Sequence, residues 1–264
     1  GGEGTMEQQV FVKGATGDDV ALPANAFTRE GHTFAGWATS ADGAVVYADG
    51  AEYDADAAGE LFAVWTPNAW TVTFHANNGS GVDATFSQPF TFGTADNLWG
   101  IALLKMIDGA FAKAGHSFDK WTTEADGTGT EYAAGAEVRD LVATPGGTVD
   151  LYAQWTVNAH TLTVVANDAV ATGTVSAGDP AEVVSGTAQL EYGTPVALGA
   201  LTPALGYAAE NVGWSVVGAT PEEGAFAMPD NDVKVSIAGT PTEYGITYMN
   251  GSATLSLAPA TFNV

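Results

Sequence analysis

The stretch GHTFAGWATSADG, residues 31–43, returns in nearly the same form as GHSFDKWTTEADG, residues 115–127. In both copies a glycine is followed by alternating residues up to a tryptophan, Trp37 or Trp121, and then by an Asp-Gly dipeptide. Alternation of this kind is typical of a half-buried β-strand, and Asp-Gly is common in tight hairpin turns. The repetition indicates either a pair of aromatic binding sites or a duplicated module in which each copy needs the same core.

The similarity extends on both sides of this stretch. Copy one closes with LFAVWT (61–66) and copy two with LYAQWT (151–156). Upstream, VFVKG ending at Gly14 corresponds to PFTFG ending at Gly93. Copy two gains residues around NLWGIALLKM (97–106), between the shared phrases, where surface loops on a common scaffold accept insertions.

Two further copies are expected downstream. Each closing phrase is followed by an alternating run, AWTVTFHAN from residue 69 and AHTLTVVAN from residue 159, and a further run of this kind, YGITYMNG, covers 244–251. The pattern therefore indicates a chain cut in mid-repeat at both ends, as a fragment of a longer array would be. We predict four parts: module 1 at 1–68, without its first strand; module 2 at 69–157, with insertions; a divergent module 3 at 158–240; and the start of a truncated fourth repeat at 241–264.

Each module is expected to form a mixed sheet of four or five strands with one short helix across it. In module 1 we expect a helical turn over 23–30, because Pro23 suits a helix N-terminus and Gly31 a C-terminal cap. The predicted fold class is mainly β, or α+β, in tandem small modules. The aromatic residues predicted to form the cores are Phe27, Phe34, Trp37, Trp65, Phe111, Phe118, Trp121, Trp155, Tyr207 and Trp214.

These phrases resemble the Listeria-Bacteroides repeat, also called the internalin B-type repeat, whose members read VTFxxNGG, GYTFxGW and LYAxW in that order. The resemblance is close over residues 5–156 and weaker over 160–238. The matching residues are Val72, Thr73, Phe74, Asn77 and Gly79; Gly31, Thr33, Phe34, Gly36 and Trp37; and Leu151, Tyr152, Ala153 and Trp155.

The resemblance implies a β-grasp-like module that occurs in tandem in secreted or wall-attached bacterial surface proteins. It implies a stalk or adhesive segment with no enzymatic activity. Two departures from the family pattern stand out. His32 and His116 replace the usual tyrosine, and Asp119-Lys120 in copy two replaces Ala35-Gly36, a change that could alter a bend in the strand.

Composition excludes several classes of partner. The chain has 7 Lys and Arg against 31 Asp and Glu, a net charge of -24, so nucleic acid and anionic membranes are poor partners. It has no cysteine, which excludes disulfides, thiolate zinc sites and cysteine nucleophiles. No run approaches the roughly 20 apolar residues of a membrane span.

The insertion in copy two is the candidate binding surface. Trp99 has no counterpart in copy one and lies beside Leu98, Leu103 and Leu104. An exposed aromatic among leucines would suit a glycan or a host protein. The alternative is a helix that covers its own module.

The other tryptophans pose the same choice. Sugar stacking could use the rings of Trp37, Trp65, Trp121 and Trp155, but alternation places them inward, where a small module without cysteine needs large side chains. We therefore favour a core role for all four.

The sequence favours neither a metal site nor catalysis. His32 and His116 occupy equivalent positions, and His75 and His160 are taken as equivalent strand-start positions, so the four rings are not expected to converge. The Asp-Gly turns, with Asp42, Asp49 and Asp126, lack the DxDxDG spacing of a calcium loop. The motifs GxSxG and HExxH and a phosphate-binding glycine loop are absent, and no lysine is shared by all three copies for a Lys–Asn bond. No catalytic residue, metal or cofactor is predicted.

The sequence thus predicts a monomeric stalk, spacer or adhesive segment of an extracellular, cell-surface or cell-wall-attached bacterial protein. Its modules would contact neighbouring repeats through the bridges TPNA (66–69) and TVNA (156–159), which would set the stiffness of the array. Two alternatives remain: a module that binds a glycan or host protein, and an accessory domain of a secreted hydrolase.

Overall fold

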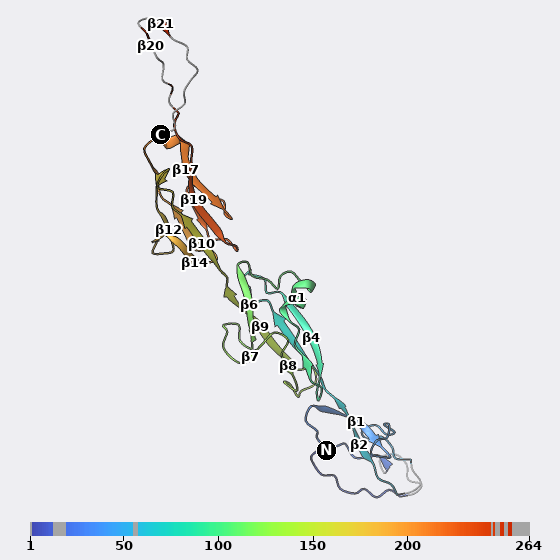
Figure 1. The fold of residues 1–264 in the computed structure, drawn as a ribbon. Helices are drawn as coiled ribbons and strands as arrows, with labels where there is room; N and C mark the ends of the chain where they lie inside the picture. Colours follow the sequence, from blue (N-terminus) through green and yellow to red (C-terminus); the bar gives the residue numbers. More distant parts are fainter. Residues whose placement is uncertain are drawn as a thin grey trace. The chain divides into compact units, whose positions relative to one another are not determined.

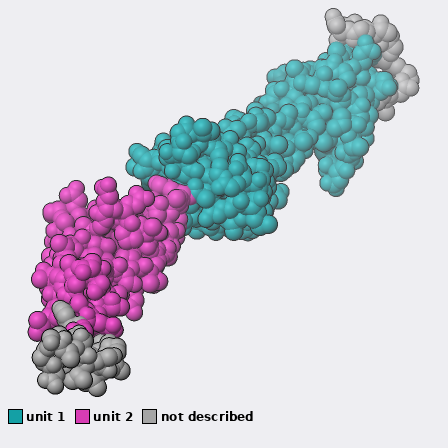
Figure 2. All heavy atoms as spheres, turned by 90° about the horizontal axis from the view of Figure 1, so that it is seen from above, with its two compact units in different colours: residues 1–112, 118–155 teal, residues 113–117, 156–264 magenta. Residues whose placement is uncertain are grey.

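The computed structural model describes residues 2–12, 20–54, 58–243, 245, 249–250 and 253–254. The chain divides into two compact units, coloured separately in Figure 2. Unit 1 comprises Gly1–Ala112 and Phe118–Trp155, and unit 2 comprises Lys113–Ser117 and Thr156–Val264. Strands dominate both units and form several mixed sheets, so the predicted mainly β fold class is confirmed.

The strands and the helix of the first 157 residues follow one another in the order in which Figure 1 labels them. Their bounds are β1 His32–Ala38, β2 Phe62–Pro67, β3 Ala69–His75, β4 Thr85–Thr91, β5 Asp96–Asn97, α1 Ile101–Ile107, β6 His116–Thr122, β7 Glu131–Tyr132, β8 Glu137–Val138 and β9 Thr148–Val157.

Module 2 forms a five-stranded mixed sheet in the order β4-β3-β9-β6-β7. Strand β3 runs antiparallel to β4 and parallel to β9. The alternation in β3 buries Trp70, Val72 and Phe74 on one face, each at most 1% exposed. These side chains pack in one core with Trp121 and with Leu104 of α1. The period-two pattern therefore places its large residues inward, as expected.

Module 1 has a smaller sheet, formed by β1 and β2 in antiparallel pairing with a register shift between Phe34 and Gly36. The helical turn predicted over 23–30 is wrong. The Asn25 side chain accepts a hydrogen bond from the Phe27 amide and donates one to the Phe27 carbonyl, both at 3.0 Å, and Thr28 pairs with Glu3. These local bonds use the backbone groups that a helix would need.

The remaining elements follow Val157. Their bounds are β10 Ala159–Val165, β11 Ala171–Thr172, β12 Val175–Ala177, β13 Glu182–Val184, β14 Gly186–Glu191, β15 Pro195–Leu198, β16 Thr202–Pro203, the 3-10 helix η2 Ala209–Asn211, β17 Val212–Val217, β18 Ala225–Ala227, β19 Val233–Gly239, β20 Met249–Asn250 and β21 Ala253–Thr254.

Unit 2 is built around two four-stranded sheets, β14-β10-β19-β17 and β13-β12-β15-β18. Strand β10 runs antiparallel to β14 and parallel to β19, which repeats the pairing of β3 with β4 and β9. Its core gathers Leu162, Val196, Met228 and Val235, which are at most 1% exposed. The opening run predicted at 244–251 lies mostly outside the described residues.

The predicted core aromatics differ in burial. Trp37, Phe111 and Trp121 are buried. The others are half-buried and packed against core residues or neighbouring rings: Phe118 and Trp155 in module 2, Tyr207 and Trp214 in unit 2, and Phe27, Phe34 and Trp65 in module 1. Among the described residues, no helix has the length and hydrophobicity to cross a membrane.

Candidate functional site

A single residue, Asn68, joins β2 of module 1 to β3 of module 2. It is 6% exposed, and all its polar groups are used. Its backbone N–H donates to the Gly31 carbonyl at 2.8 Å, and its carbonyl accepts from the Phe92 N–H at 2.9 Å. Its side-chain oxygen accepts from the Thr33 hydroxyl and its amide donates to the Ala143 carbonyl, both at 2.7 Å. Asn68 therefore ties a turn and a strand of module 1 to two segments of module 2.

The Gly31 turn packs directly against an aromatic ring of module 2. Gly31 has a φ of +66°, and a Cβ at this position would lie 2.2 Å from the Phe92 ring. The neighbouring His32 meets the same ring edge-on, with centroids 5.7 Å apart. Glycine is needed here both for the left-handed backbone and for the close approach of Phe92.

The same arrangement recurs within unit 2, where Asn158 is the one residue between β9 and β10. Its N–H donates to the Gly115 carbonyl and its carbonyl accepts from the Tyr192 N–H, both at 2.8 Å. Its side-chain oxygen accepts from the Ser117 hydroxyl at 2.7 Å, and its amide donates to Asp230 Oδ1 at 2.9 Å. Only the last partner differs in kind, a carboxylate replacing a backbone carbonyl.

Gly115 repeats the geometry of Gly31. Its φ is also +66°, a Cβ would lie 2.0 Å from the Tyr192 ring, and His116 meets that ring edge-on with centroids 6.4 Å apart. The histidines that replace the family's tyrosine thus both lie at this joint. We refer to each set of an asparagine, a Gly-His turn and a facing aromatic as a joint.

Asp230 gives the second joint an electrostatic component. It accepts hydrogen bonds from the Asn158 amide and from His160 Nε2 at 2.8 Å. These bonds, the Asn158 bond foremost, hold the pKa of the Asp230 carboxyl below its usual range.

The bridges TPNA and TVNA gave the sequence signal for the joints, because each carries its asparagine at the same place. The partners of that asparagine were missed. Phe92 and Tyr192 come from the following strand pair, and no local pattern connects them to Gly31 or Gly115.

The structure separates the four residues predicted as a binding surface. Leu98 and Leu104 are 2% and 0% exposed, so they belong to the core of module 2 and not to its surface. Trp99 is half-buried and packs on Phe74 and Phe86. Leu103 alone of the four is exposed, at 41%. The short helix α1 covers its own module, since its apolar spacing turns Leu104 inward.

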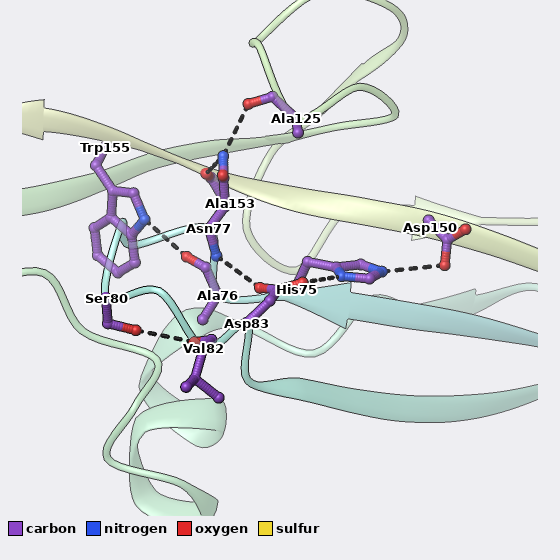
Figure 3. A network of polar contacts seen from close by, with 10 residues as sticks. All are labelled: His75, Ala76, Asn77, Ser80, Val82, Asp83, Ala125, Asp150, Ala153 and Trp155. Atoms are coloured by element: carbon purple, nitrogen blue, oxygen red, sulfur yellow. Dashed lines mark hydrogen bonds and ion pairs between the residues drawn. The ribbon is translucent and has the colours of Figure 1, made fainter.

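The end of β3 carries the polar network drawn in Figure 3. Asn77, with a φ of 45°, donates its amide to the carbonyls of Ala125 and Ala153 at 2.9 and 3.0 Å. The Trp155 indole N–H donates to the Ala76 carbonyl at 2.9 Å. These bonds fasten the residues after β3 to β9, which explains the asparagine of the VTFxxN phrase as a structural residue.

His75 lies in the same network, between Asp83 and, at 3.2 Å, Asp150. It is the last residue of β3, whereas His160 is the second residue of β10 and takes the place of Trp70. The expectation that His75 and His160 are equivalent is therefore wrong: the strand pairing sets Trp70 opposite Phe90 and His160 opposite Leu190.

Metal and ligand sites find little support in the described part of the chain. No group of three or more His, Asp or Glu residues there is arranged to hold a metal ion. Asp126 accepts bonds from the amide and hydroxyl of Thr128 in its own turn, which lowers the pKa of its carboxyl, and Asp49 accepts from the Asn25 N–H. A hollow of about 140 Å³ in unit 2, lined in part by Gly173 and Trp214, is smaller than the roughly 300–1,000 Å³ of typical ligand pockets.

Comparison with known proteins gives two relatives, both from Evansella cellulosilytica. A protein named "Putative Gly-rich membrane protein" is 27% identical over 151 residues, which cover 53% of this chain and 16% of the relative. A protein named "Putative membrane protein" is 26% identical over 133 residues, 49% of this chain and 18% of the relative. The chain thus spans less than a fifth of the length of either relative. No solved structure matches it.

A sequence model of the Listeria-Bacteroides repeat domain matches residues 1–64 and 70–154, which are the two copies anticipated from the repeated phrases. The matched segments end on either side of Asn68, so the first joint lies between them. The chain belongs to the Listeria-Bacteroides repeat domain family.

Proposed function

We propose that this chain is a non-catalytic repeat segment of a bacterial surface protein, and that it serves as a spacer. The names of the two relatives support a place at the membrane or cell surface. We also propose that residues 158–240 are a third, divergent repeat, because β10 pairs with β14 and β19 as β3 pairs with β4 and β9.

The joint is the observation that carries the spacer function. Linkers between independent domains are usually flexible and polar, which permits relative motion. Here one residue stands between β2 and β3, and that residue makes four hydrogen bonds at 2.7–2.9 Å. A link so short and so fully bonded restrains the module on either side of Asn68 and transmits force between them.

A spacer under tension should also unfold in parts. The buried clusters of module 2 and unit 2 share no residue, so each can resist force separately. Pulling single molecules from both ends should give separate unfolding steps. The step of module 2, residues 69–157, should release roughly 300 Å of chain, at about 3.5 Å per residue.

The control for this measurement is the Asn68→Ala variant. It should leave the length of the module 2 step unchanged and lower the force at which module 1 separates from it. One cooperative step for the whole chain would contradict the spacer proposal, because the modules would then share a core.

A second candidate function rests on α1. Leu103, Met106 and Ile107 are 41%, 84% and 47% exposed on a helix that module 1 lacks at the corresponding place. Apolar side chains three and four residues apart on a helix form one face, and such a face suits adhesion to a protein or glycan. The test is a binding screen against glycans and host extracellular proteins. Met106→Ser should abolish any hit without changing the melting temperature, whereas Trp99→Ala should destabilise module 2.

A further inference from the structure

Module 1 has an open sheet edge at a place where the other sheets have a strand. In module 2, β9 pairs with β6 on one side and with parallel β3 on the other. In unit 2, β19 has β17 and parallel β10. The corresponding strand of module 1, β2, pairs with β1 alone among the described residues.

Side chains beside this edge are less covered than their counterparts. Leu61 and Ala63 correspond to Leu151 and Ala153 in the closing phrase. Leu151 and Ala153 are 0% exposed, whereas Leu61 and Ala63 are only half-buried. The buried clusters of the described residues include none in module 1, although Trp37 itself is 4% exposed.

An indole donor and a displaced strand point to the same gap. Trp155 donates to the Ala76 carbonyl just after β3, but the indole N–H of its counterpart Trp65 has no hydrogen-bond partner in the described part of the chain. Phe11, which corresponds to the buried Phe90 of β4, is half-buried, and residues 4–12 form no strand. A β4-like segment has no ladder to join when its β3-like neighbour is missing.

We propose that the open edge of β2 is a strand-docking site. Its occupant is an opening strand of this same repeat type, about seven residues long, that runs parallel to β2. By the register of β3 on β9, its aromatic residue would lie opposite Leu61, as Phe74 lies opposite Leu151. The carbonyl two residues later would accept from Trp65.

The source to which we commit is the polypeptide on the N-terminal side of module 1. In module 2 the strand and the β4 segment are consecutive, with β3 ending at His75 and β4 beginning at Thr85. Residues 8–12 hold the β4-like place, so the strand that precedes them along the chain is the natural neighbour.

The site can be tested in trans on the whole 264-residue chain. The probe is a synthetic peptide with the sequence of residues 69–78, and the control is the same peptide with Val72→Asp and Phe74→Asp. Hydrogen exchange at the backbone amides of 62–65 should slow about tenfold when the peptide is present at about ten times its dissociation constant. The amides of 150–153, whose edge β3 already occupies, serve as the internal control and should not change.

Two results would overturn the proposal. If neither peptide slows exchange at 62–65 up to roughly 1 mM, the weakest useful affinity, the edge is no docking site. Equal slowing by both peptides would mean that binding ignores the apolar side chains.

The source has its own test. A chain with a copy of residues 69–83 placed ahead of residue 1 should protect 62–65 without added peptide and should no longer bind it. Protection in the unextended chain that rises with protein concentration, together with dimers in sedimentation, would overturn the N-terminal source in favour of a second copy.

Discussion

Asn68 and Asn158 each satisfy a backbone donor, a backbone acceptor and both ends of a side-chain amide in one place. Alanine at position 68 would keep the backbone bonds but leave the Thr33 hydroxyl and the Ala143 carbonyl without their partner. We expect Asn68→Ala to lower the free energy of unfolding of unit 1 by about 1–3 kcal/mol, the cost of buried groups left unpaired. Urea denaturation followed by tryptophan fluorescence measures this, and a loss below about 0.5 kcal/mol would mean that water replaces the amide.

The second joint should respond to pH when its asparagine is made acidic. The low folded-state pKa of Asp230 means that its contribution to stability is complete above the ordinary carboxyl value, about 3.9, and is lost as the pH falls through the depressed value. In Asn158→Asp the donor becomes a second carboxylate facing Asp230. The variant should therefore be most destabilised relative to wild type at neutral pH, and the difference should narrow towards about pH 4.

Denaturation midpoints at several pH values test this prediction, with His160 and His116 unchanged beside the pair. The matched control is the double variant Asn158→Asp with Asp230→Asn, which removes the second charge and should recover stability at neutral pH. A defect that does not vary with pH would show that repulsion between the carboxylates is not its cause.

Trp121 tests how the core aromatics contribute. It is 0% exposed, and its indole nitrogen has no hydrogen-bond partner among the described residues. Trp121→Ala should cost about 3–5 kcal/mol of unfolding free energy through the cavity it leaves. Trp121→Phe should cost less than half as much, because phenylalanine keeps much of the ring and buries no unpaired donor. Equal losses in the two variants, measured by chemical denaturation, would contradict this assignment.

At the scale of the element, the Gly-His turn can be separated into its two constraints. Gly31→Ala meets both a φ of +66° and the Phe92 ring, whereas Gly50 has a φ of +70° and no atom within 4 Å of the place a Cβ would take. Gly50→Ala should therefore show the backbone strain alone, about 1 kcal/mol. Gly31→Ala should lose clearly more, in the same thermal unfolding assay, because the ring must move as well. Similar losses would mean that Phe92 yields freely.

The elements also show what sequence can and cannot predict. The strands β1, β2, β6 and β9 follow from the shared phrases, since alternation and hairpin signals are local. The helical turn at 23–30 failed because the Asn25 side chain bonds to Phe27, a competition that propensity does not reveal. The inward turn of Leu104 was foreseen only as an alternative, because one apolar run fits a surface helix and a covering helix equally well.

At the scale of the whole molecule, the net charge of -24 should oppose folding in dilute salt. Raising NaCl from about 10 mM to about 500 mM shortens the Debye length from roughly 30 Å to under 8 Å. We therefore expect the melting temperature to rise with salt, as differential scanning calorimetry would measure. Because calcium binding could mimic this effect, the titration should be repeated with a chelator. A melting temperature that falls with salt would contradict a dominant role for charge repulsion.

The joints mark the limit of sequence reasoning for the whole chain. The asparagine in each bridge is visible as a repeated letter, and the glycine of each turn as another. That Gly31 meets Phe92, and Gly115 meets Tyr192, depends on how consecutive strand pairs stack, which is a property of tertiary structure. The repeated letters could therefore identify the candidate residues but not their partners.

The one-residue link has a consequence for how such proteins change over generations. Every group that a joint requires lies within a short distance of the link or on the repeat that follows, and most are backbone atoms or an asparagine amide. Unequal recombination between two copies would delete or insert a whole repeat and leave each surviving joint with all its partners. The length of the array could thus vary among related strains by whole repeats without any compensating mutation.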